Sequence, residues 1–465
     1  MIYLKNLKGK KIGVLGLGRT GFSIIVSAEK SGAKVLCWDD DEKKRDLAIQ
    51  KGYELANLNQ EKELKILDLL LVSPGVPHLY PEVHEIVKLA YRMNIEVDND
   101  VGLFFSYYLT LDFDEFEREP KVISITGSNG KSTVTALAQH VLSQIFEDVQ
   151  MGGNIGKPVL EFNECKESSM RIIELSSYQI ERAQSLCPDI VTFLNFSPDH
   201  GVRHGGKGGY FYAKARLFTE SSAEIAIINI DTDEGLFLFN KLKNSQIKIL
   251  AITHGKVTNH LDWVVNTKKH FLTEWKNGKQ LFSFDIRSFN EKDLMSLEPS
   301  ITAVYAIARS LGVAPKKLMQ LFVGFKSLDH RNQLIGNVQG VKFINDSKAT
   351  NVASATHALK MHKNIHWIAG GQAKDKNFSE ICNKEKNIKK AYLIGEAASL
   401  IRSVLVNTEV EVFLTLDDAF KKVLENIENG DTVLFSPACA SFDQYLNFED
   451  RGKHFVELTN QHKKA

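Results

Sequence analysis

The most constraining feature of this chain is a glycine-rich turn at residues 126–133, with the sequence Thr-Gly-Ser-Asn-Gly-Lys-Ser-Thr. It follows the β-branched run at 122–125, so the order strand, turn, helix is predicted. Glycines let main-chain amides approach an anion closely, Lys131 can place a positive charge on outer phosphates, and Ser132 can offer a hydroxyl to Mg²⁺. The turn therefore predicts a site for ATP or GTP. Ile125 stands where such loops usually begin with glycine, which makes this a variant loop, and a glycine-containing turn with a chance lysine is the alternative.

A second glycine-rich turn lies at residues 16–21, between a predicted strand and a predicted helix, and Asp39 closes the next strand. This pattern is typical of a βαβ unit that binds a dinucleotide. A UDP-sugar satisfies the same physics, because it too places a diphosphate at a helix N-terminus and a ribose hydroxyl near an acid. Nucleotide binding of some kind and a structural turn without a ligand both remain open.

Polar side chains follow two predicted strands of the central region. Glu174 ends the strand at 171–174, and His200 comes after the strand that ends at Leu194. Such positions face the ligand crevice of an open α/β sheet, and a carboxylate is a natural ligand for Mg²⁺. Histidine more often selects softer metals, so a solvated loop histidine is the alternative for His200. Lys214 lies in a predicted helix, and the residues alone predict an ordinary surface lysine there.

Three further polar turns follow predicted strands in the last third of the chain, at 345–351, 370–374 and 436–441. Because the carboxyl ends of parallel strands meet at one edge of a sheet, these turns predict a binding rim. Solvated loops are the alternative.

The length of 465 residues exceeds what one hydrophobic core usually supports, and about 150 residues per domain predicts about three domains. All three are expected to be α/β: an N-terminal Rossmann-like domain at 1–98, a central P-loop-type ATPase domain at 99–327, and a C-terminal Rossmann-like domain at 328–465.

Charge and composition exclude several classes of partner. The formal net charge is +1 with no block of like charges, so nucleic acid is not an expected partner. No run approaches about 18 apolar residues and no apolar stretch of signal-peptide type follows the first residues, so we expect a cytoplasmic protein without membrane insertion. The five cysteines are scattered, which argues against disulfides and a zinc site.

Taken together, these segments resemble the Mur ligase family over the whole chain. The most specific pieces are 126–133, 152–156, 174–179, Asp199 with His200, 345–351 and 436–441. The resemblance implies a monomeric, cytoplasmic, ATP-dependent amide ligase of peptidoglycan precursor synthesis. It implies that the enzyme joins D-glutamate to UDP-N-acetylmuramoyl-L-alanine through an acyl phosphate and releases ADP and phosphate. The choice of D-glutamate depends mainly on the turn at 345–351.

The resemblance also implies roles for individual residues, carried over by position. The catalytic residues would be Lys131, His200, Lys214 and Lys348. ATP would contact Gly127, Ser128, Asn129, Gly130, Lys131, Ser132, Thr133, Arg331 and Asp346. The UDP substrate would contact Gly18, Thr20, Asp39, Asp40, Ser73 and Asn154. D-Glutamate would contact Lys348, Thr350, Ser436 and Phe442. Two Mg²⁺ ions would be held by Ser132, Glu174, His200 and, if it is carbamylated, Lys214.

Some positions depart from the family pattern. Glu298 and Pro299 stand where the family usually has His-Asn near the adenine, Gly201 and Val202 precede Arg203 where an acid is usual, and Asp329 replaces a common proline. We expect altered nucleotide affinity rather than lost chemistry. The competing hypotheses are a dehydrogenase, a folate polyglutamylating ligase and a non-catalytic binding relative.

Overall fold

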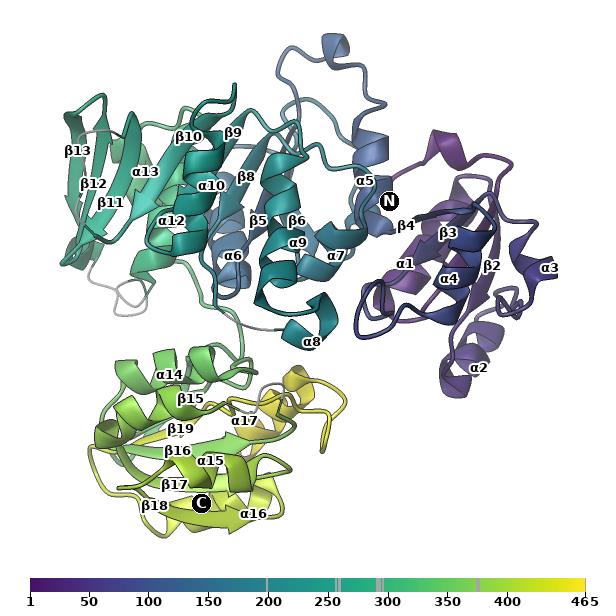
Figure 1. The fold of residues 1–465 in the computed structure, drawn as a ribbon. Helices are drawn as coiled ribbons and strands as arrows, with labels where there is room; N and C mark the ends of the chain where they lie inside the picture. Colours follow the sequence, from purple (N-terminus) through teal and green to yellow (C-terminus); the bar gives the residue numbers. More distant parts are fainter. Residues whose placement is uncertain are drawn as a thin grey trace. The chain divides into compact units, whose positions relative to one another are not determined.

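The computed structural model describes residues 1–197, 200–255, 257, 261–289, 294, 297–373 and 377–464. The chain forms two compact units, Met1–Phe325 and Lys326–Ala465. The first unit contains two sheets and the second contains one (Figure 1). Among the described residues, no helix is both long and apolar enough to cross a membrane.

The first sheet is a small parallel sheet of order β2-β1-β3-β4. Its strands are β1 (Lys11–Leu15), β2 (Lys34–Trp38), β3 (Leu69–Val72) and β4 (Glu96–Asp98). Its helices are α1 (Arg19–Lys30), α2 (Glu42–Gln50), α3 (Glu61–Leu64) and α4 (Glu85–Arg92). The predicted βαβ unit is confirmed, because β1 and β2 pair in parallel with α1 between them.

The second sheet has the order β13-β12-β11-β10-β9-β8-β5-β7-β6. Its parallel strands are β5 (Lys121–Thr126), β6 (Val149–Gly153), β7 (Met170–Glu174), β8 (Ile190–Phe193), β9 (Ile225–Asn229), β10 (Lys248–Thr253) and β11 (Trp263–Lys268). Strands β12 (Phe271–Lys276) and β13 (Lys279–Asp285) extend it in antiparallel fashion. The strand before the phosphate turn, β5, lies between β7 and β8, inside the parallel part.

The helices around the second sheet are α5 (Asp100–Tyr108), α6 (Lys131–Leu142), α7 (Ser177–Arg182), α8 (Gly201–His204), α9 (Lys207–Thr219), α10 (Asp233–Leu242), α12 (Glu298–Ser310) and α13 (Pro315–Leu321). Helices α6 to α10 lie between strands of the second sheet, α5 precedes its first strand, and α12 and α13 follow its last. Short 3₁₀ turns are η1 (Lys5–Leu7), η2 (Phe113–Glu115), η3 (Val159–Glu161) and η4 (Ile286–Phe289). The helix predicted after the phosphate turn is confirmed as α6.

The second unit has a six-stranded sheet of order β14-β15-β19-β16-β17-β18, parallel except for β14. Its strands are β14 (Gln333–Val338), β15 (Val341–Asn345), β16 (Ile365–Gly370), β17 (Ile388–Ile394), β18 (Glu409–Phe413) and β19 (Thr432–Phe435). Its helical elements are α14 (Val352–Met361), η5 (Ser379–Asn387), α15 (Ala398–Val404), α16 (Leu416–Leu424) and α17 (Phe448–Lys464).

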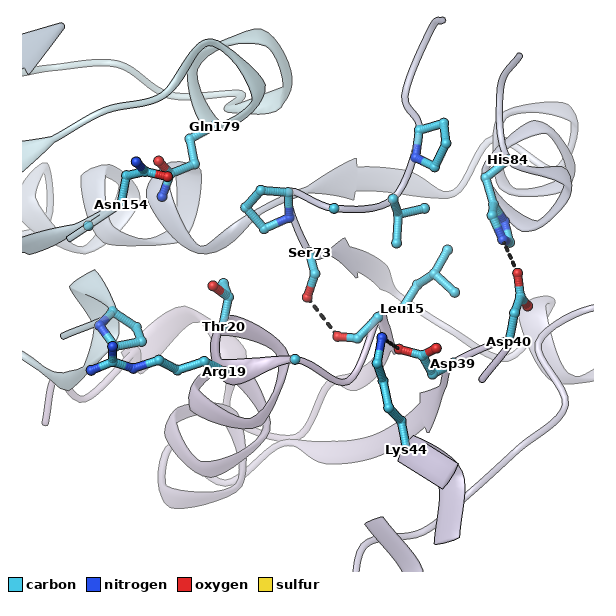
Figure 2. A pocket seen from close by; sticks show the side chains of 18 of the residues that line it. Leu15, Arg19, Thr20, Asp39, Asp40, Lys44, Ser73, His84, Asn154 and Gln179 are labelled. Atoms are coloured by element: carbon cyan, nitrogen blue, oxygen red, sulfur yellow. Dashed lines mark hydrogen bonds and ion pairs between the residues drawn. The ribbon is translucent and has the colours of Figure 1, made fainter. Parts of the chain in front are cut away.

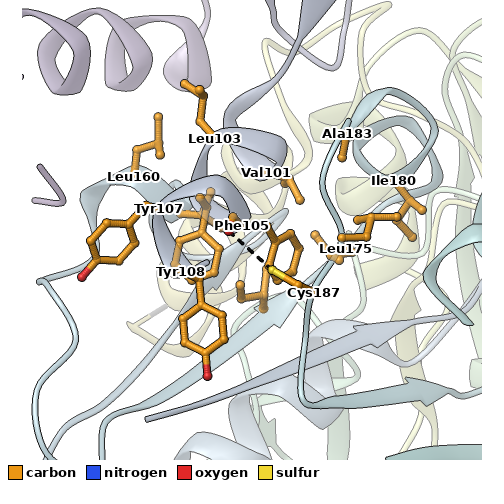
Figure 3. Close-up of a cluster of buried hydrophobic side chains, with 14 of the residues drawn as sticks. Val101, Leu103, Phe105, Tyr107, Tyr108, Leu160, Leu175, Ile180, Ala183 and Cys187 are labelled. Carbon is orange, nitrogen blue, oxygen red and sulfur yellow. Dashed lines mark hydrogen bonds between the residues drawn. The ribbon is translucent and has the colours of Figure 1, made fainter. Parts of the chain in front are cut away.

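One hydrophobic core joins the two sheets of the first unit through α5. Phe104 and Phe105 are fully buried, and this core includes both β1 residues and residues of β5, β7 and β8. Figure 3 shows Val101 and Tyr108 of α5 in the same cluster as Leu175 and Ile180. Full burial of one such side chain stabilises the fold by about 1.5–3 kcal/mol, so this shared core fixes the first sheet against the second.

Candidate active site

The phosphate turn needs glycine at two positions. Gly130 precedes α6 with φ of 81°, and Gly127 has φ of 152°. A Cβ on Gly127 would lie 3.0 Å from Leu194 Cβ, and left-handed backbone is strained for other residues. The turn joins the end of β5 to the N-terminus of α6, where main-chain amides and the helix dipole favour an anion.

Lys131 closes this turn with its own side chain. Its ammonium donates to the carbonyl oxygens of Gly127 at 2.9 Å and Ser128 at 3.0 Å. Ser132, on the first turn of α6, is buried. Lys131 and Ser132 thus lie in the turn and at the start of α6, as the sequence predicted. Their roles, a positive charge for the phosphates and a hydroxyl for the metal, stay predictions.

Lys214 is not a surface lysine. Its side chain on α9 is 1% exposed, and its ammonium donates to the Gly127 carbonyl at 2.9 Å and lies 4.5 Å from the centre of the Tyr210 ring. The prediction from the residues alone was wrong, because α9 packs against the phosphate turn and sequence spacing does not show that packing. Lys131 and Lys214 therefore converge on one carbonyl oxygen.

Glu174 provides a buried carboxylate beside the phosphate turn. It ends β7, is 2% exposed, and pairs in register with Ile125 of β5. Its Oε1 accepts from the Asn154 amide at 2.8 Å, whereas its Oε2 has no hydrogen-bond partner among the described residues. A buried carboxylate oxygen without a hydrogen-bond partner is unfavourable unless a cation or a donor reaches it.

These residues fit Mg²⁺ better than a softer metal. No group of three or more His, Cys, Asp and Glu gathers in the part of the chain that the structure describes. One free carboxylate oxygen and a hydroxyl suit Mg²⁺, which usually keeps water and phosphate oxygens in its coordination shell.

His200 lies in an aromatic cluster rather than in open solvent. It precedes α8 with a left-handed φ of 53°, and its ring centre lies 5.1 Å from that of Tyr178 and 5.9 Å from that of Tyr210. The Tyr210 hydroxyl is 3.3 Å from Ser128 Oγ in the phosphate turn. Asp199, named with His200 in the sequence, lies outside the described residues.

A cavity of about 530 Å³ lies between the first sheet and the second within the first unit (Figure 2). All six residues predicted to contact the UDP substrate line it: Gly18, Thr20, Asp39, Asp40, Ser73 and Asn154. Gly18, Asp39, Asp40 and Ser73 come from loops of the first sheet, Thr20 from the first turn of α1, and Asn154 from the loop after β6. Figure 2 shows Asn154 and Gln179 on a different part of the ribbon from Thr20 and Ser73.

Asp39 braces the glycine-rich turn at the cavity. Its Oδ2 accepts from the Leu17 amide at 2.7 Å and from Lys44 Nζ at 3.3 Å, and its Oδ1 accepts from the Asp41 amide at 2.9 Å. Ser73 supports the same turn, since its hydroxyl donates to the Gly16 carbonyl at 2.6 Å. A carboxylate has about four acceptor sites, so Asp39 can still accept a further donor.

Asp40, next to Asp39 in the chain, forms a pair with His84 at the cavity. Their Oδ2 and Nε2 atoms are 2.8 Å apart, and this hydrogen bond holds the pKa of Asp40 below its usual value. The Ile86 amide donates to His84 Nδ1 at 3.2 Å, so Nε2 carries the proton that reaches Asp40.

Four polar side chains of this cavity were not predicted from the sequence: Arg19, Lys44, His84 and Gln179. Arg19 lies within the glycine-rich turn and Lys44 follows the next strand, and basic residues at such positions are the signal that could have identified them. Gln179 lay in a segment already singled out. His84 has no signal in the sequence.

In the second unit, the three predicted polar strand ends do meet at one edge of the sheet. Ser436 Oγ donates to Asp346 Oδ2 at 2.7 Å, and the Gly370 amide donates to the Pro437 carbonyl at 2.9 Å. The Asn332 amide donates to Asp346 Oδ1 at 3.0 Å, and burial raises the pKa of Asp346 to about 7. Lys374 of the third turn lies outside the described residues.

The remaining predicted residues of this unit differ in exposure. Lys348 Nζ lies 3.9 Å from the centre of the Phe448 ring, whereas Phe442 is 66% exposed. Arg331 and Thr350 are partly buried. The buried Arg451, which the sequence analysis missed, joins two of the turns by donating to the carbonyls of Ser347, Cys439 and Ala440 at 2.8, 3.0 and 3.1 Å.

Glu298, one of the positions that depart from the family pattern, has a hydrogen-bond partner in another element. Glu298 begins α12, and its Oε2 lies 3.0 Å from Nδ1 of His270 in the turn between β11 and β12. A histidine therefore reaches this helix start from another element.

Comparison with known families decides what this arrangement is. Residues 10–96 match the Mur ligase MurD-like N-terminal domain, residues 125–297 the Mur ligase middle domain, and residues 330–439 the Mur ligase glutamate ligase domain. The chain belongs to the Mur ligase family. The resemblance found in the sequence is confirmed. The match of the central region to a Mur ligase domain argues against the competing hypothesis of a dehydrogenase.

Full-length relatives of this Mur ligase are of the MurD type. The chain is 42% identical over 459 residues to the UDP-N-acetylmuramoylalanine--D-glutamate ligase of Cereibacter sphaeroides, covering 98% of this chain and 99% of that protein. It is 43% identical to the ligase of the same name from Dinoroseobacter shibae, with 98% of each covered. This Mur ligase is therefore ATP-dependent, as its family is.

Solved structures of other Mur ligases share the fold. UDP-N-acetylmuramate-alanine ligase MurC from Thermotoga maritima has a TM-score of 0.59 at 15% identity, covering 98% of this chain and 100% of that one. MurF from Acinetobacter baumannii has a TM-score of 0.58 at 15% identity, covering 98% and 93%. The predicted three-domain α/β architecture is confirmed.

Proposed function

We propose that this chain is the ATP-dependent ligase that joins D-glutamate to UDP-N-acetylmuramoyl-L-alanine during peptidoglycan precursor synthesis. The observation that carries the proposal is the match of 42% identity along 98% of the chain to a ligase named for this reaction. The family pattern at 345–351 supports D-glutamate as the incoming amino acid. Because both the ATP and the nucleotide-sugar substrates belong to the cytoplasm, we assign the enzyme to that compartment, and we propose that it acts as a monomer.

The three domains divide the substrates between them. Residues 1–98 take the UDP part, residues 99–327 take ATP, and residues 328–465 take D-glutamate. The cavity supports the first assignment, since all six proposed UDP-substrate contacts line it. Two basic side chains at the same cavity, Arg19 and Lys44, suit a diphosphate.

ATP is placed at the phosphate turn, residues 127–133, with Lys131 at its outer phosphates. The position of α6 supports this, because the loop amides and the helix N-terminus both favour an anion. Arg331 and Asp346 complete the proposed ATP contacts from the C-terminal domain. Glu298, paired with His270, is where we expect the adenine end to differ from other family members.

The chemistry follows from the poor reactivity of a carboxylate as an acyl donor. The lactoyl-alanine carboxylate oxygen attacks the γ-phosphorus of ATP, the bond to the bridging oxygen breaks, and ADP leaves. The amine of D-glutamate then attacks the acyl carbon, the amine loses a proton, and inorganic phosphate departs. Lys131 offsets the charge that builds on the transferring phosphoryl group. Exclusion of water protects the acyl phosphate from hydrolysis.

Two Mg²⁺ ions are part of the proposal, one held by Ser132 and Glu174 and one by His200 and a carbamylated Lys214. Bound there, they would screen the phosphate charges. The free Oε2 of Glu174 supports the first site. The position of Lys214 supports the second site, because its buried side chain and that of Lys131 reach the same carbonyl of the phosphate turn.

We place D-glutamate at the strand ends of the second unit, against Lys348, Thr350, Ser436 and Phe442. Lysine and hydroxyl donors suit its two carboxylates. The hydrogen bond from Ser436 to Asp346 supports a shared site, because it joins the amino-acid turn to the residue assigned to ATP.

The test is ADP and phosphate release from ATP and Mg²⁺ with UDP-N-acetylmuramoyl-L-alanine and one amino acid at a time. We expect release and a glutamylated product, identified by mass, with D-glutamate alone. Release with L-glutamate or a diamino acid but not with D-glutamate would overturn the assignment.

A further inference from the structure

One wall of the cavity is a loop whose main chain is hydrogen-bonded to two arginines on helices next to the second sheet. This pocket loop, residues 73–78, follows β3, and Ser73, Pro74, Gly75, Val76 and Pro77 line the cavity. The donors are Arg182, at the end of α7, and Arg203, in α8. Neither arginine lines the cavity itself, and neither has a role in the proposed chemistry.

Arg182 binds the pocket loop at both of its ends. Its Nη1 donates to the Ser73 carbonyl at 3.3 Å, its Nη2 to the Val76 carbonyl at 3.1 Å, and its Nε to His78 Nδ1 at 2.7 Å. The side chain is 3% exposed. Burial lowers the pKa of His78 to about 4, so the ring stays neutral and Nδ1 remains an acceptor.

Arg203 binds the middle of the same loop. Its Nη1 donates to the Gly75 carbonyl at 3.2 Å, and its Nη2 donates to the carbonyls of Val76 at 3.2 Å and Pro74 at 3.4 Å. Together the two guanidinium groups satisfy four consecutive carbonyls of the loop. A planar fork of fixed donors restricts the orientation of each peptide plane that it binds.

Arg203 also connects the cavity to the segment that contains His200. Its guanidinium lies 4.8 Å from the centre of the Tyr178 ring, and that ring lies 5.1 Å from the ring of His200. Tyr178 stacks on His204, which is hydrogen-bonded to Ser177 at 2.9 Å. The pocket loop, α7 and α8 are thus one connected network of packed rings and hydrogen bonds.

We propose that Arg182 and Arg203 are positioning residues that hold the pocket loop in its UDP-binding shape, and that Arg203 couples occupancy of the cavity to the placement of His200. The assignment of UDP to this cavity rests on the proposed function. The two cations next to the cavity, of which Arg182 is buried, also make it more attractive to a diphosphate.

The test compares Arg182→Gln and Arg203→Gln with the natural protein in two binding measurements. Calorimetric titration uses uridine diphosphate itself, and a second titration uses a non-hydrolysable ATP analogue with Mg²⁺. We expect both variants to bind uridine diphosphate at least about tenfold more weakly, which is about 1.4 kcal/mol. Only Arg203→Gln should also weaken the ATP analogue, because only Arg203 contacts Tyr178.

Arg216→Gln is the matched control. Arg216 also donates to main-chain carbonyls, those of Ile180, Glu181 and Ala183 at 2.7, 2.6 and 3.2 Å, but it does not contact the pocket loop. Arg182→Lys and Arg203→Lys keep the charge and lose the fork, so they test the geometry in proteins with the same net charge. We expect these lysine variants to bind uridine diphosphate weakly too.

Unchanged affinity for uridine diphosphate in both glutamine variants would overturn the proposal, and so would equal weakening in Arg216→Gln. Turnover of the natural protein with D-glutamate decides the proposed function separately. Binding of uridine diphosphate without glutamylation would sink that function and leave the positioning roles standing.

Discussion

At the scale of single residues, two lysines donate to the carbonyl of Gly127. The sequence predicts the place of one of them and not that of the other. Lys131 was predicted as a phosphate ligand because its place in the turn defines its surroundings. Lys214 lies 83 positions later, in a helix of ordinary composition, so only the packing of α9 reveals that it is buried at the same atom.

Replacing Lys131 with alanine should separate catalysis from substrate binding. Without this cation, the charge on the transferring phosphoryl group is offset less completely, and we expect turnover to fall at least about a hundredfold. The dissociation constant of uridine diphosphate should not change, because Lys131 does not line the cavity. Phosphate release and calorimetry measure the two effects, and retained turnover would exclude Lys131 as a phosphate ligand.

Lys214→Arg distinguishes a cation from a carbamate at this position. Arginine keeps the positive charge but does not add CO₂ under these conditions, because its guanidinium stays protonated. If Lys214 works as an anion, the variant should lose at least about a hundredfold in turnover while its thermal unfolding stays cooperative. Wild-type turnover in this variant would show that the cation suffices.

At the scale of elements, strands with buried centres and polar ends were the predictable ones. Strands β5, β7, β15 and β19 are apolar runs that end at chemistry-bearing turns, and all four were foreseen. Edge strands β14 and β18 alternate half-buried and exposed residues, and β4 has three residues, so their sequences do not differ from loops. The polar stretch at 254–290 contains β11, which pairs in parallel with β10, and the antiparallel strands β12 and β13.

The start of α5 predicts how stability depends on pH. Asp100 is 1% exposed, neither carboxylate oxygen has a partner among the described residues, and burial raises its pKa to about 7 from 3.8. Burial raises the pKa of Asp98 to about 7 as well. The folded state thus binds more protons than the unfolded state between about pH 4 and 7, so stability falls as pH rises through that window.

Asp100→Asn should remove part of this dependence. The measured quantity is the free energy of unfolding of the variant minus that of the natural protein. We expect this difference to be more favourable to the variant at pH 8 than at pH 5 by about 1 kcal/mol or more, since one pKa unit corresponds to about 1.4 kcal/mol. Urea unfolding at the two pH values measures the difference. An equal change at both values would mean that Asp100 is not protonated in the folded state near neutral pH.

At the scale of the whole molecule, the first unit contains two sheets under one core and the second unit has its own cores. The sequence indicated three α/β domains, but it could not show that α5 merges the first two into one packed unit. That merger depends on contacts such as those of Phe104 and Leu160, which are far apart in the sequence.

Uridine diphosphate should stabilise the two units unequally. Its proposed contacts all lie in the first unit, so at a hundred times its dissociation constant it should add about 2.7 kcal/mol to the unfolding of that unit. Calorimetry of the full chain should show one transition shifted upward and a second unchanged. A parallel shift of both would mean that the units unfold together.

The cavity has a practical consequence for inhibition. Among the described residues around it, none belongs to the phosphate turn at 126–133. On the proposed function, a small molecule that fills it would compete with the sugar nucleotide and would not have to displace ATP. Residues 15–84 and 153–179 both line the cavity, so a compound that contacts both ranges would keep part of its contacts after a substitution in one of them.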